Sequence, residues 1–133
     1  MRKLSYSLIG LVLLVAACKD TEKVTPNGLK FTVLKAGEGP VAKTSQILLV
    51  DFQLKDSKDS VWNDSYKEAM PAPVEIQDST RMAAEDGITQ MFRMLSVGDS
   101  VKTTMTVPDF FKKLIKRPIP PGIDSSLSLT YTF

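Results

Sequence analysis

Hydrophobic residues recur along the 133-residue chain with two different periods. Apolar and polar side chains alternate in four stretches, the pattern of β-strands with one buried face: Leu29–Val33, Leu48–Leu54, Val101–Val107 and Leu127–Phe133. Turn-forming residues bound two shorter apolar pieces, which predict short strands near Val61–Trp62 and Val74–Ile76. The four alternating stretches make up most of a predicted antiparallel sheet of four to five strands.

A helix is predicted over residues 81–95, where the period becomes that of an amphipathic helix. Apolar residues there lie four, three and four positions apart: Ala84, Ile88, Met91 and Leu95. Ser79 or Thr80 is expected to cap the first turn, and Gly98 to follow the last turn in a left-handed conformation. Gly87, in the middle, costs up to roughly 1 kcal/mol relative to alanine.

Residues 108–124 are predicted to form an irregular surface loop. Pro118, Pro120 and Pro121 cannot donate hydrogen bonds to a sheet, and they favour extended geometry in the residues before them. An antiparallel sheet that covers a single helix gives the fold class α+β.

The N-terminal residues have the pattern of a bacterial export signal. Arg2 and Lys3 precede the apolar run Leu4–Ala17, which at 14 residues is shorter than the about 20 needed to span a bilayer. The run ends in Val15-Ala16-Ala17-Cys18, which resembles the lipobox of bacterial lipoproteins. An ordinary signal peptide, or a buried thiol at Cys18, is the alternative.

These features predict three segments. Residues 1–17 would be a lipoprotein signal peptide, residues 18–27 a lipidated Cys18 with a polar tether, and residues 28–133 the folded domain. Because two or more acyl chains attach a protein to a membrane durably, we expect it to be anchored in the bacterial cell envelope, at the periplasmic face or the cell surface.

Charge and composition exclude several functions. Removing residues 1–17 takes away two of the 17 basic residues and none of the 15 acidic ones, which leaves 15 of each. A neutral domain lacks the basic surface that nucleic acids require, and its one basic cluster, which includes Lys112, fits a solvated loop. The chain has no histidine and one cysteine, so histidine triads, internal disulfides and thiolate zinc sites are excluded. We expect neither a metal nor a cofactor.

The order of motifs over residues 28–133 resembles the FKBP family of peptidyl-prolyl cis-trans isomerases. The matching stretches are Gly28–Pro40, Leu49–Phe52, Glu85–Ile88 with Met94–Asp99, Val107–Phe110 and Ile119–Pro121. The resemblance implies a twisted antiparallel sheet of four to five strands wrapped around one short α-helix. It also implies isomerisation of X-Pro bonds in exported polypeptides by an apolar pocket, without covalent catalysis, and a monomeric protein.

The resemblance also implies a set of pocket residues. Phe52, Trp62 and Val74 would stand at wall aromatics, and Leu129 at a phenylalanine. Asn63 would replace a pocket aspartate, and the backbone N–H of Arg81 would contact the ligand. The residues expected to act in catalysis are therefore Phe52, Trp62, Asn63, Val74, Arg81 and Leu129. A wider substrate-binding set would comprise Ile76, Thr80, Ala84, Phe110, Phe111 and Lys112.

Several of these residues depart from the family pattern, and several could have a purely structural role. Ala84 would stand where the family has a tryptophan floor, which removes a large aromatic surface and predicts weak substrate affinity. Phe52, Val74 and Leu129 could also be ordinary core residues, and Asn63 part of a solvated turn. The sequence therefore leaves two functions open: a tethered isomerase, and a catalytically weak or inactive module that binds a protein partner.

Overall fold

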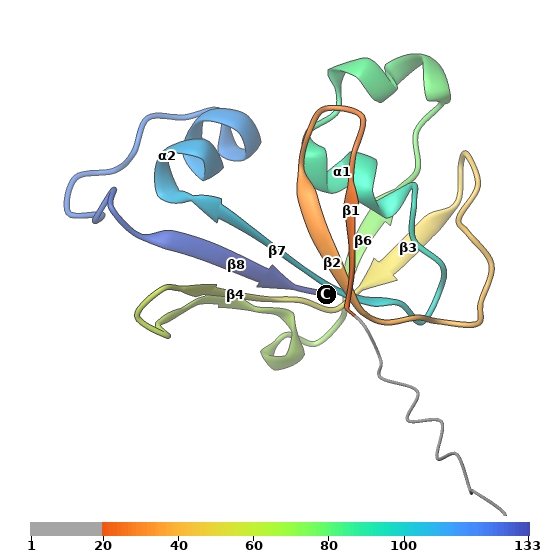
Figure 1. Cartoon of the computed structure of the whole chain (residues 1–133), viewed down its shortest axis with the longest axis horizontal. Coiled ribbons are helices and arrows are strands. Elements are labelled where there is room, and N and C mark those ends of the chain that lie inside the picture. Colours follow the sequence, from red (N-terminus) through yellow and green to blue (C-terminus); the bar gives the residue numbers. More distant parts are fainter. Residues whose placement is uncertain (1–19) are drawn as a thin grey trace, which may run out of the picture.

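The structure is a computed structural model that describes residues 20–133 (Figure 1). The predicted signal peptide and Cys18 lie outside the described residues. Within residues 20–133, no helix combines the length and the hydropathy needed to cross a membrane.

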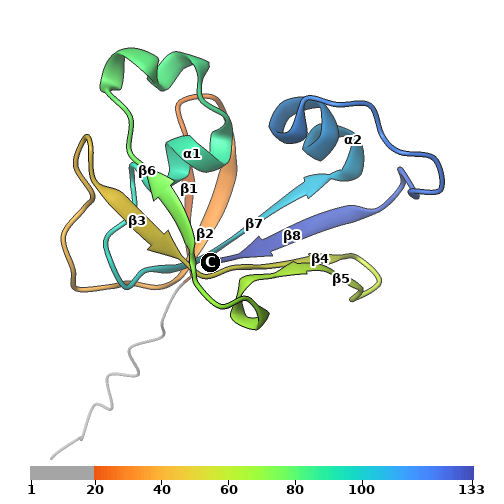
Figure 2. The ribbon, with the colours of Figure 1, turned by 180° about the vertical axis from the view of Figure 1, so that it is seen from behind.

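The described chain forms two antiparallel sheets around a short helix. The larger sheet has six strands, in the order β1 (Thr21–Val24), β2 (Lys30–Lys35), β7 (Ser100–Thr106), β8 (Ser128–Thr132), β4 (Gln53–Asp56) and β5 (Val61–Asp64). The smaller sheet pairs β3 (Ile47–Val50) with β6 (Ala72–Glu75). α1 (Gly87–Phe92) lies between the small sheet and the β1–β2 end of the large sheet, as Figures 1 and 2 show from opposite sides. The α+β prediction is confirmed.

The predicted strand Leu48–Leu54 is divided between the two sheets. The break falls at Asp51 and Phe52, and the buried Ser65 holds it. Ser65 Oγ accepts a hydrogen bond from the Phe52 N–H at 2.8 Å and donates one to Asp51 Oδ1 at 3.2 Å, while the Ser65 N–H donates to the Phe52 carbonyl at 2.9 Å. These bonds satisfy the N–H and carbonyl of Phe52, which lies between β3 and β4 and pairs with neither sheet.

Residues 21–24 form a strand, although the sequence analysis placed them in a tether. β1 pairs with β2 from Thr21 opposite Val33 to Val24 opposite Lys30. The hairpin turn is closed by Thr25, whose buried hydroxyl accepts from the Leu29 N–H at 3.0 Å. Alternation of apolar residues did not reveal β1, because every one of its side chains is exposed.

The predicted helix over residues 81–95 is only partly correct. Asp78, rather than Ser79 or Thr80, caps a 3-10 helix η2 (Ser79–Ala84), and Asp86 caps α1. Asp86 has an extended backbone, which separates the two helices. Gly87 is therefore the first residue of α1, where a Cβ atom would stand 2.6 Å from Leu29 Cβ. Close packing against the turn that leads into β2 requires glycine there.

Gly98 is left-handed, with φ +92°, but it lies in the turn before β7 rather than at the helix end. A Cβ there would stand 3.3 Å from Gly37 Cα, so the two glycines allow the turns before β7 and after β2 to touch.

The prediction of an irregular loop over residues 108–124 is wrong in its first half. Val107–Asp109 form α2, and Phe110–Ile115 continue as the π-helical turn η3, which ends at Lys116 with φ 57°. Pro108 lies in the first turn, where its missing N–H breaks no helical bond. The prolines that terminate regular structure come only after Arg117.

Two clusters make up the hydrophobic core. The first packs α1 against the sheets and contains Phe31, Ile76, Ile88, Met91, Phe92, Leu95 and Val101. The second lies under α2 and η3 and contains Leu54, Val107, Phe110, Leu127 and Leu129. Met105, Leu114 and Tyr131 pack against both. These three side chains therefore join the two halves of the molecule.

Replacing Ser65 with alanine should lower the free energy of unfolding by about 1–3 kcal/mol, because the Phe52 N–H then loses its buried acceptor. Urea denaturation followed by circular dichroism measures this. Ser125→Ala, at an exposed serine, is the matched control and should change stability little. Equal stabilities of the two variants would show that Ser65 does not hold the break.

Candidate functional site

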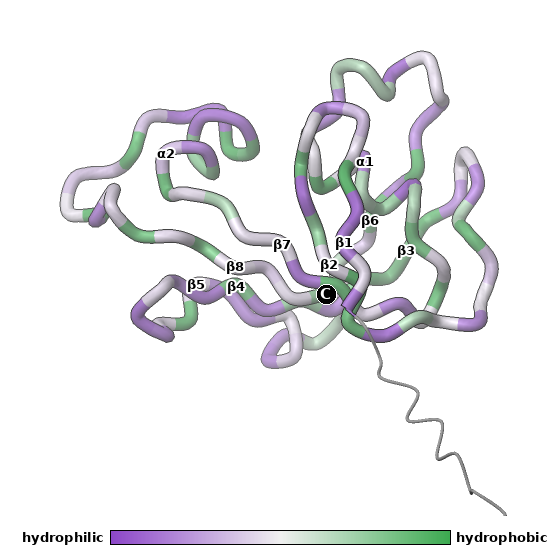
Figure 3. The backbone as a smooth tube through the Cα atoms, viewed as in Figure 1, coloured by the Kyte–Doolittle hydropathy of each residue, from purple (hydrophilic) through white to green (hydrophobic). Residues whose placement is uncertain are grey.

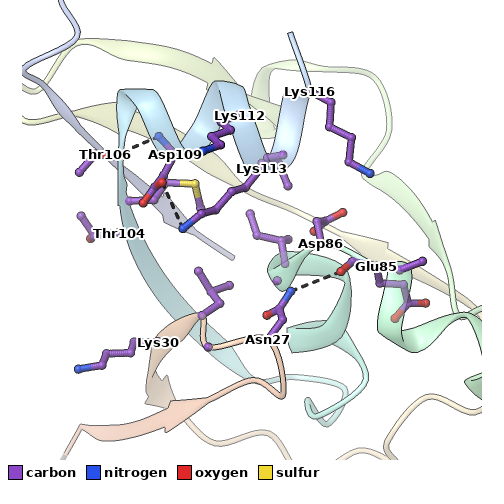
Figure 4. A pocket seen from close by; sticks show the side chains of 17 residues that line it. Asn27, Lys30, Glu85, Asp86, Thr104, Thr106, Asp109, Lys112, Lys113 and Lys116 are labelled. Carbon is purple, nitrogen blue, oxygen red and sulfur yellow. Dashed lines mark hydrogen bonds and ion pairs between the residues drawn. The ribbon is translucent and has the colours of Figure 1, made fainter. Parts of the chain in front are cut away.

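A cleft of about 630 Å³ opens between the start of α1 and the helical segment η3 (Figure 4). Its lower side is formed by the turn after β1 and the first residues of β2, and its back by the end of β7. The apolar part of its lining consists chiefly of Leu29, Ile88, Met105 and Leu114. Met105 and Leu114 also pack against both core clusters, so the bottom of the cleft is the junction between them.

Acidic side chains at the cleft are already engaged. Glu85 receives two hydrogen bonds from Arg93, at 2.7 Å from Nε and 2.6 Å from Nη2, and this pairing raises the pKa of Arg93. Asp86 caps α1 by accepting from the Thr89 N–H at 2.9 Å. Asp109 is 3.1 Å from Lys113 (Figure 4). These carboxylates hold the walls in place.

Lysines form another part of the rim. Lys30, Lys112 and Lys116 line the cleft, and none of them makes an ion pair within residues 20–133. The cleft therefore combines an apolar bottom with a rim that carries both lysines and carboxylates. Such a mixture of apolar lining and a few polar groups is typical of a ligand-binding cleft.

Beside the cleft lies an aromatic row, which we define as Trp62, Phe110, Tyr131 and Phe52. Ring centroids are 6.3 Å apart between Trp62 and Phe110, 6.3 Å between Phe110 and Tyr131, and 5.7 Å between Tyr131 and Phe52. These spacings are those of interacting aromatic rings. Burial raises the pKa of Tyr131 to about 12, so the row carries no charge near neutral pH.

Trp62 owes its position to a β-bulge and a buried carboxylate. The register between β4 and β5 shifts so that Leu54 faces Asn63 and Lys55 faces Val61, which leaves Trp62 without a direct partner. Its indole N–H donates to Asp56 Oδ2 at 2.9 Å. That bond first, with the backbone N–H groups of Lys58 and Ser60, holds the pKa of the Asp56 carboxyl below its usual 3.8.

The structure brings together five of the predicted site residues. Phe52, Trp62, Phe110 and Phe111 are linked by ring contacts, the last two at 5.2 Å, and Leu129 is fully buried in the same cluster. Ala84 and Lys112 line the cleft from opposite sides. The row and the cleft are neighbours, since Met105, Leu114 and Tyr131 connect them.

Other predicted residues lie elsewhere. Val74 is half-buried and Ile76 buried, both in the cluster around α1. Asn63 is exposed, and its Oδ1 accepts from the Asp64 N–H at 2.8 Å. Thr80 and Arg81 are exposed on η2, where the Arg81 N–H, expected to contact a ligand, donates to the Asp78 carbonyl at 3.0 Å. In this conformation the Arg81 N–H is therefore not free to bind a ligand.

No protein-family model and no curated protein matches this sequence. Solved structures do match. FkpA from Escherichia coli has a TM-score of 0.57 at 19% identity, over 84% of this chain and 48% of that one. A peptidyl-prolyl cis-trans isomerase from Pseudomonas syringae pv. tomato has a TM-score of 0.56 at 15% identity, over 86% and 78% of the two chains. AtFKBP13 has a TM-score of 0.50 at 22% identity, over 84% and 94%.

The chain has the FKBP fold. It spans about half the length of FkpA. Identity to these FKBP-fold structures is 22% or less, so the likeness shows the fold alone.

Sequence reasoning missed three residues of this FKBP-fold site. Asp56 lies two residues after Leu54, on the same side of an extended chain, so its carboxylate could be expected to reach inward. Tyr131 belongs to the predicted C-terminal strand, and its position two residues after Leu129 indicated the same face. Met105 likewise lies on the inward side of its strand, but its place at the cleft depends on η3, which was not predicted.

The Asp56 carboxylate should make stability depend on pH. Because its pKa is lowered in the folded state, its contribution is complete above the unfolded value of 3.8 and is lost as pH falls through the lower folded value. Asp56→Asn should therefore be less stable than wild type at pH 7 and approach it below pH 3.8. Asp59→Asn, in the same turn, should parallel wild type throughout. Urea unfolding at several pH values tests this, and a constant difference between Asp56→Asn and wild type would contradict it.

Proposed function

We propose that this chain is an FKBP-type peptidyl-prolyl cis-trans isomerase, anchored in the bacterial envelope through lipid on Cys18, that acts on X-Pro bonds of exported proteins. The observation that carries the proposal is the aromatic row, which is buried at Phe110 and half-buried at its other three rings, directly beside an open cleft with an apolar bottom.

Prolyl isomerisation suits such a surface. Its barrier of about 18–20 kcal/mol comes from amide resonance, and no covalent bond breaks, so no nucleophile is required. An environment with little water disfavours the charge-separated planar amide relative to its twisted form. Phe52 and Trp62 would supply apolar ring surface for the prolyl ring, and the cleft would receive the chain beside it.

A second candidate is a module of the same fold that binds proline-containing partners with little or no catalysis. Three observations favour it: Ala84 offers no aromatic floor, the Arg81 N–H is already hydrogen-bonded, and buried Phe110 occupies space against Trp62. The two candidates share a binding surface and differ in whether the bound amide is twisted faster than in water.

Catalysis is tested by NMR exchange spectroscopy on an X-Pro peptide, with a chain that begins at Lys19. Phe52 pairs with Tyr131 and Phe133, and Phe52→Leu keeps apolar volume but removes the ring that would contact the prolyl ring. One such aromatic contact is worth about 0.5–1.5 kcal/mol, so kcat/KM should fall about twofold to tenfold. Tyr66→Leu, at an exposed tyrosine outside the row, is the matched control and should leave the rate unchanged. Exchange at the uncatalysed rate with excess wild-type protein would refute the isomerase and leave the binding module.

Restoring the floor should increase activity. Ala84 is exposed at a cleft of about 630 Å³, which has room for an indole. Ala84→Trp should raise kcat/KM about twofold to tenfold by adding one aromatic contact to the prolyl ring. Ala83→Trp, next to it and outside the cleft lining, is the control. No gain specific to position 84 would mean that the prolyl ring does not bind there.

The anchor is tested separately by mass spectrometry of the full-length protein expressed in a bacterium. Wild type should lose residues 1–17 and gain the mass of acyl chains, and Cys18→Ala should gain none. Identical unmodified masses would show that Cys18 carries no lipid.

A further inference from the structure

We propose that the surface formed by Val41, Ile47, Leu49 and Val97 rests on the lipid bilayer, so that the domain lies against the membrane in one fixed orientation. We call it the bilayer face. This inference rests on the lipidation of Cys18 proposed above, and it adds which surface of the domain meets the lipid and why.

The distance between the proposed lipid and the fold is short. β1 begins at Thr21, so only Lys19 and Asp20 separate Cys18 from a residue paired in the sheet. Three Cα–Cα steps of 3.80 Å reach at most about 11 Å. A tether to residue 27 would have allowed the domain to turn freely, but with β1 starting at Thr21 the first residue of the sheet stays within about 11 Å of the lipidated residue, which restricts how the domain can turn.

Hydrogen bonds link this end of the sheet to the bilayer face. Thr21 stands opposite Val33, and β2 then runs through Lys35 into Gly37–Val41. The Gly39 N–H donates to the Val97 carbonyl, and the Val97 N–H to the Pro40 carbonyl, both at 3.0 Å. The segment after β2 and the turn before β7 therefore lie together near the start of β1, as Figures 1 and 2 show from both sides.

Four of the well-exposed side chains of this region are apolar. Val41 is 46% exposed, Ile47 63%, Leu49 67% and Val97 52%. Ile47 and Val97 line one shallow hollow, Val41 is bridged to Ser96, and Ile47 and Leu49 share the outer face of β3, which is hydrophobic along its length (Figure 3). A contiguous apolar surface of this kind marks an interaction site.

Charge favours lipid chains over anionic headgroups as the contact. Two acidic side chains lie around these residues, Glu38 and Glu75, the latter directly opposite Ile47 in the small sheet, with one basic side chain, Lys43. A surface without excess positive charge gains nothing from the field of an anionic leaflet, so apolar side chains must supply the contact. Binding of the bilayer face should therefore persist on zwitterionic lipid.

The experiment uses the lipidated protein in phosphatidylcholine vesicles, with the acyl mass on Cys18 first confirmed. A polarity-sensitive fluorophore is attached to the introduced thiol of Val97→Cys or, in a second variant, Leu49→Cys. Val61→Cys is the matched control, because Val61 is 43% exposed and lies on β5, the opposite edge of the large sheet from β1. Positions 97 and 49 should give blue-shifted emission that nitroxide-bearing lipid chains quench, and position 61 should give neither.

Each other outcome is decisive. If the acyl mass is present and all three probes report water, the orientation is wrong while the anchor stands. If the acyl mass is absent, Cys18 is not lipidated, and both the anchor and the bilayer face are contradicted. If positions 97 and 49 are shifted equally without vesicles and light scattering shows a dimer, a second copy covers this surface and the bilayer proposal is overturned.

Discussion

The structure depends on the central strand β7, which is paired along both edges. β2 lies on one side and β8 on the other. The inward side chains of β7 are Val101, Thr103 and Met105; Val101 belongs to the first hydrophobic cluster, and Met105 packs against both clusters. Thr103 is buried, yet its hydroxyl donates to the Lys30 carbonyl at 2.7 Å, so the polar group within the core is satisfied. Because both clusters pack on β7, neither half of the molecule can form its core alone.

This arrangement explains why the cleft lies where it does. α1 covers one part of the inner face and η3 another, and the lining of the cleft between them includes Met105 and Leu114. The aromatic row crosses the same junction through Tyr131, whose ring stacks on Phe133 at 5.2 Å. Phe133 in turn meets Phe92 of α1 edge-on at 5.1 Å. A ligand bound at this junction would contact both parts of the core.

Asp56 and Ser65 position two side chains of the aromatic row, Trp62 and Phe52. Both residues are buried and polar, and both accept backbone hydrogen bonds at places where a strand is interrupted. Ser65 fixes the passage from the small sheet to the large one beside Phe52. Asp56 fixes the indole of Trp62, which the bulge in β5 has turned toward Phe110. Two aromatic side chains are thus positioned by polar groups, which are directional where apolar contacts are not.

The sequence by itself determined the fold class, the strands with one buried face and the apolar character of Phe52, Trp62 and Leu129, because alternation reports directly which side chains avoid water. It could not reveal β1, whose side chains are all exposed, nor the division at Asp51, which depends on a serine 14 residues away. Tertiary structure also decided that Asp86 caps α1, since Gly87 must pack on Leu29, and that Ala84 and Lys112 line the same cleft. These features arise from contacts between segments distant in the chain, which no local period encodes.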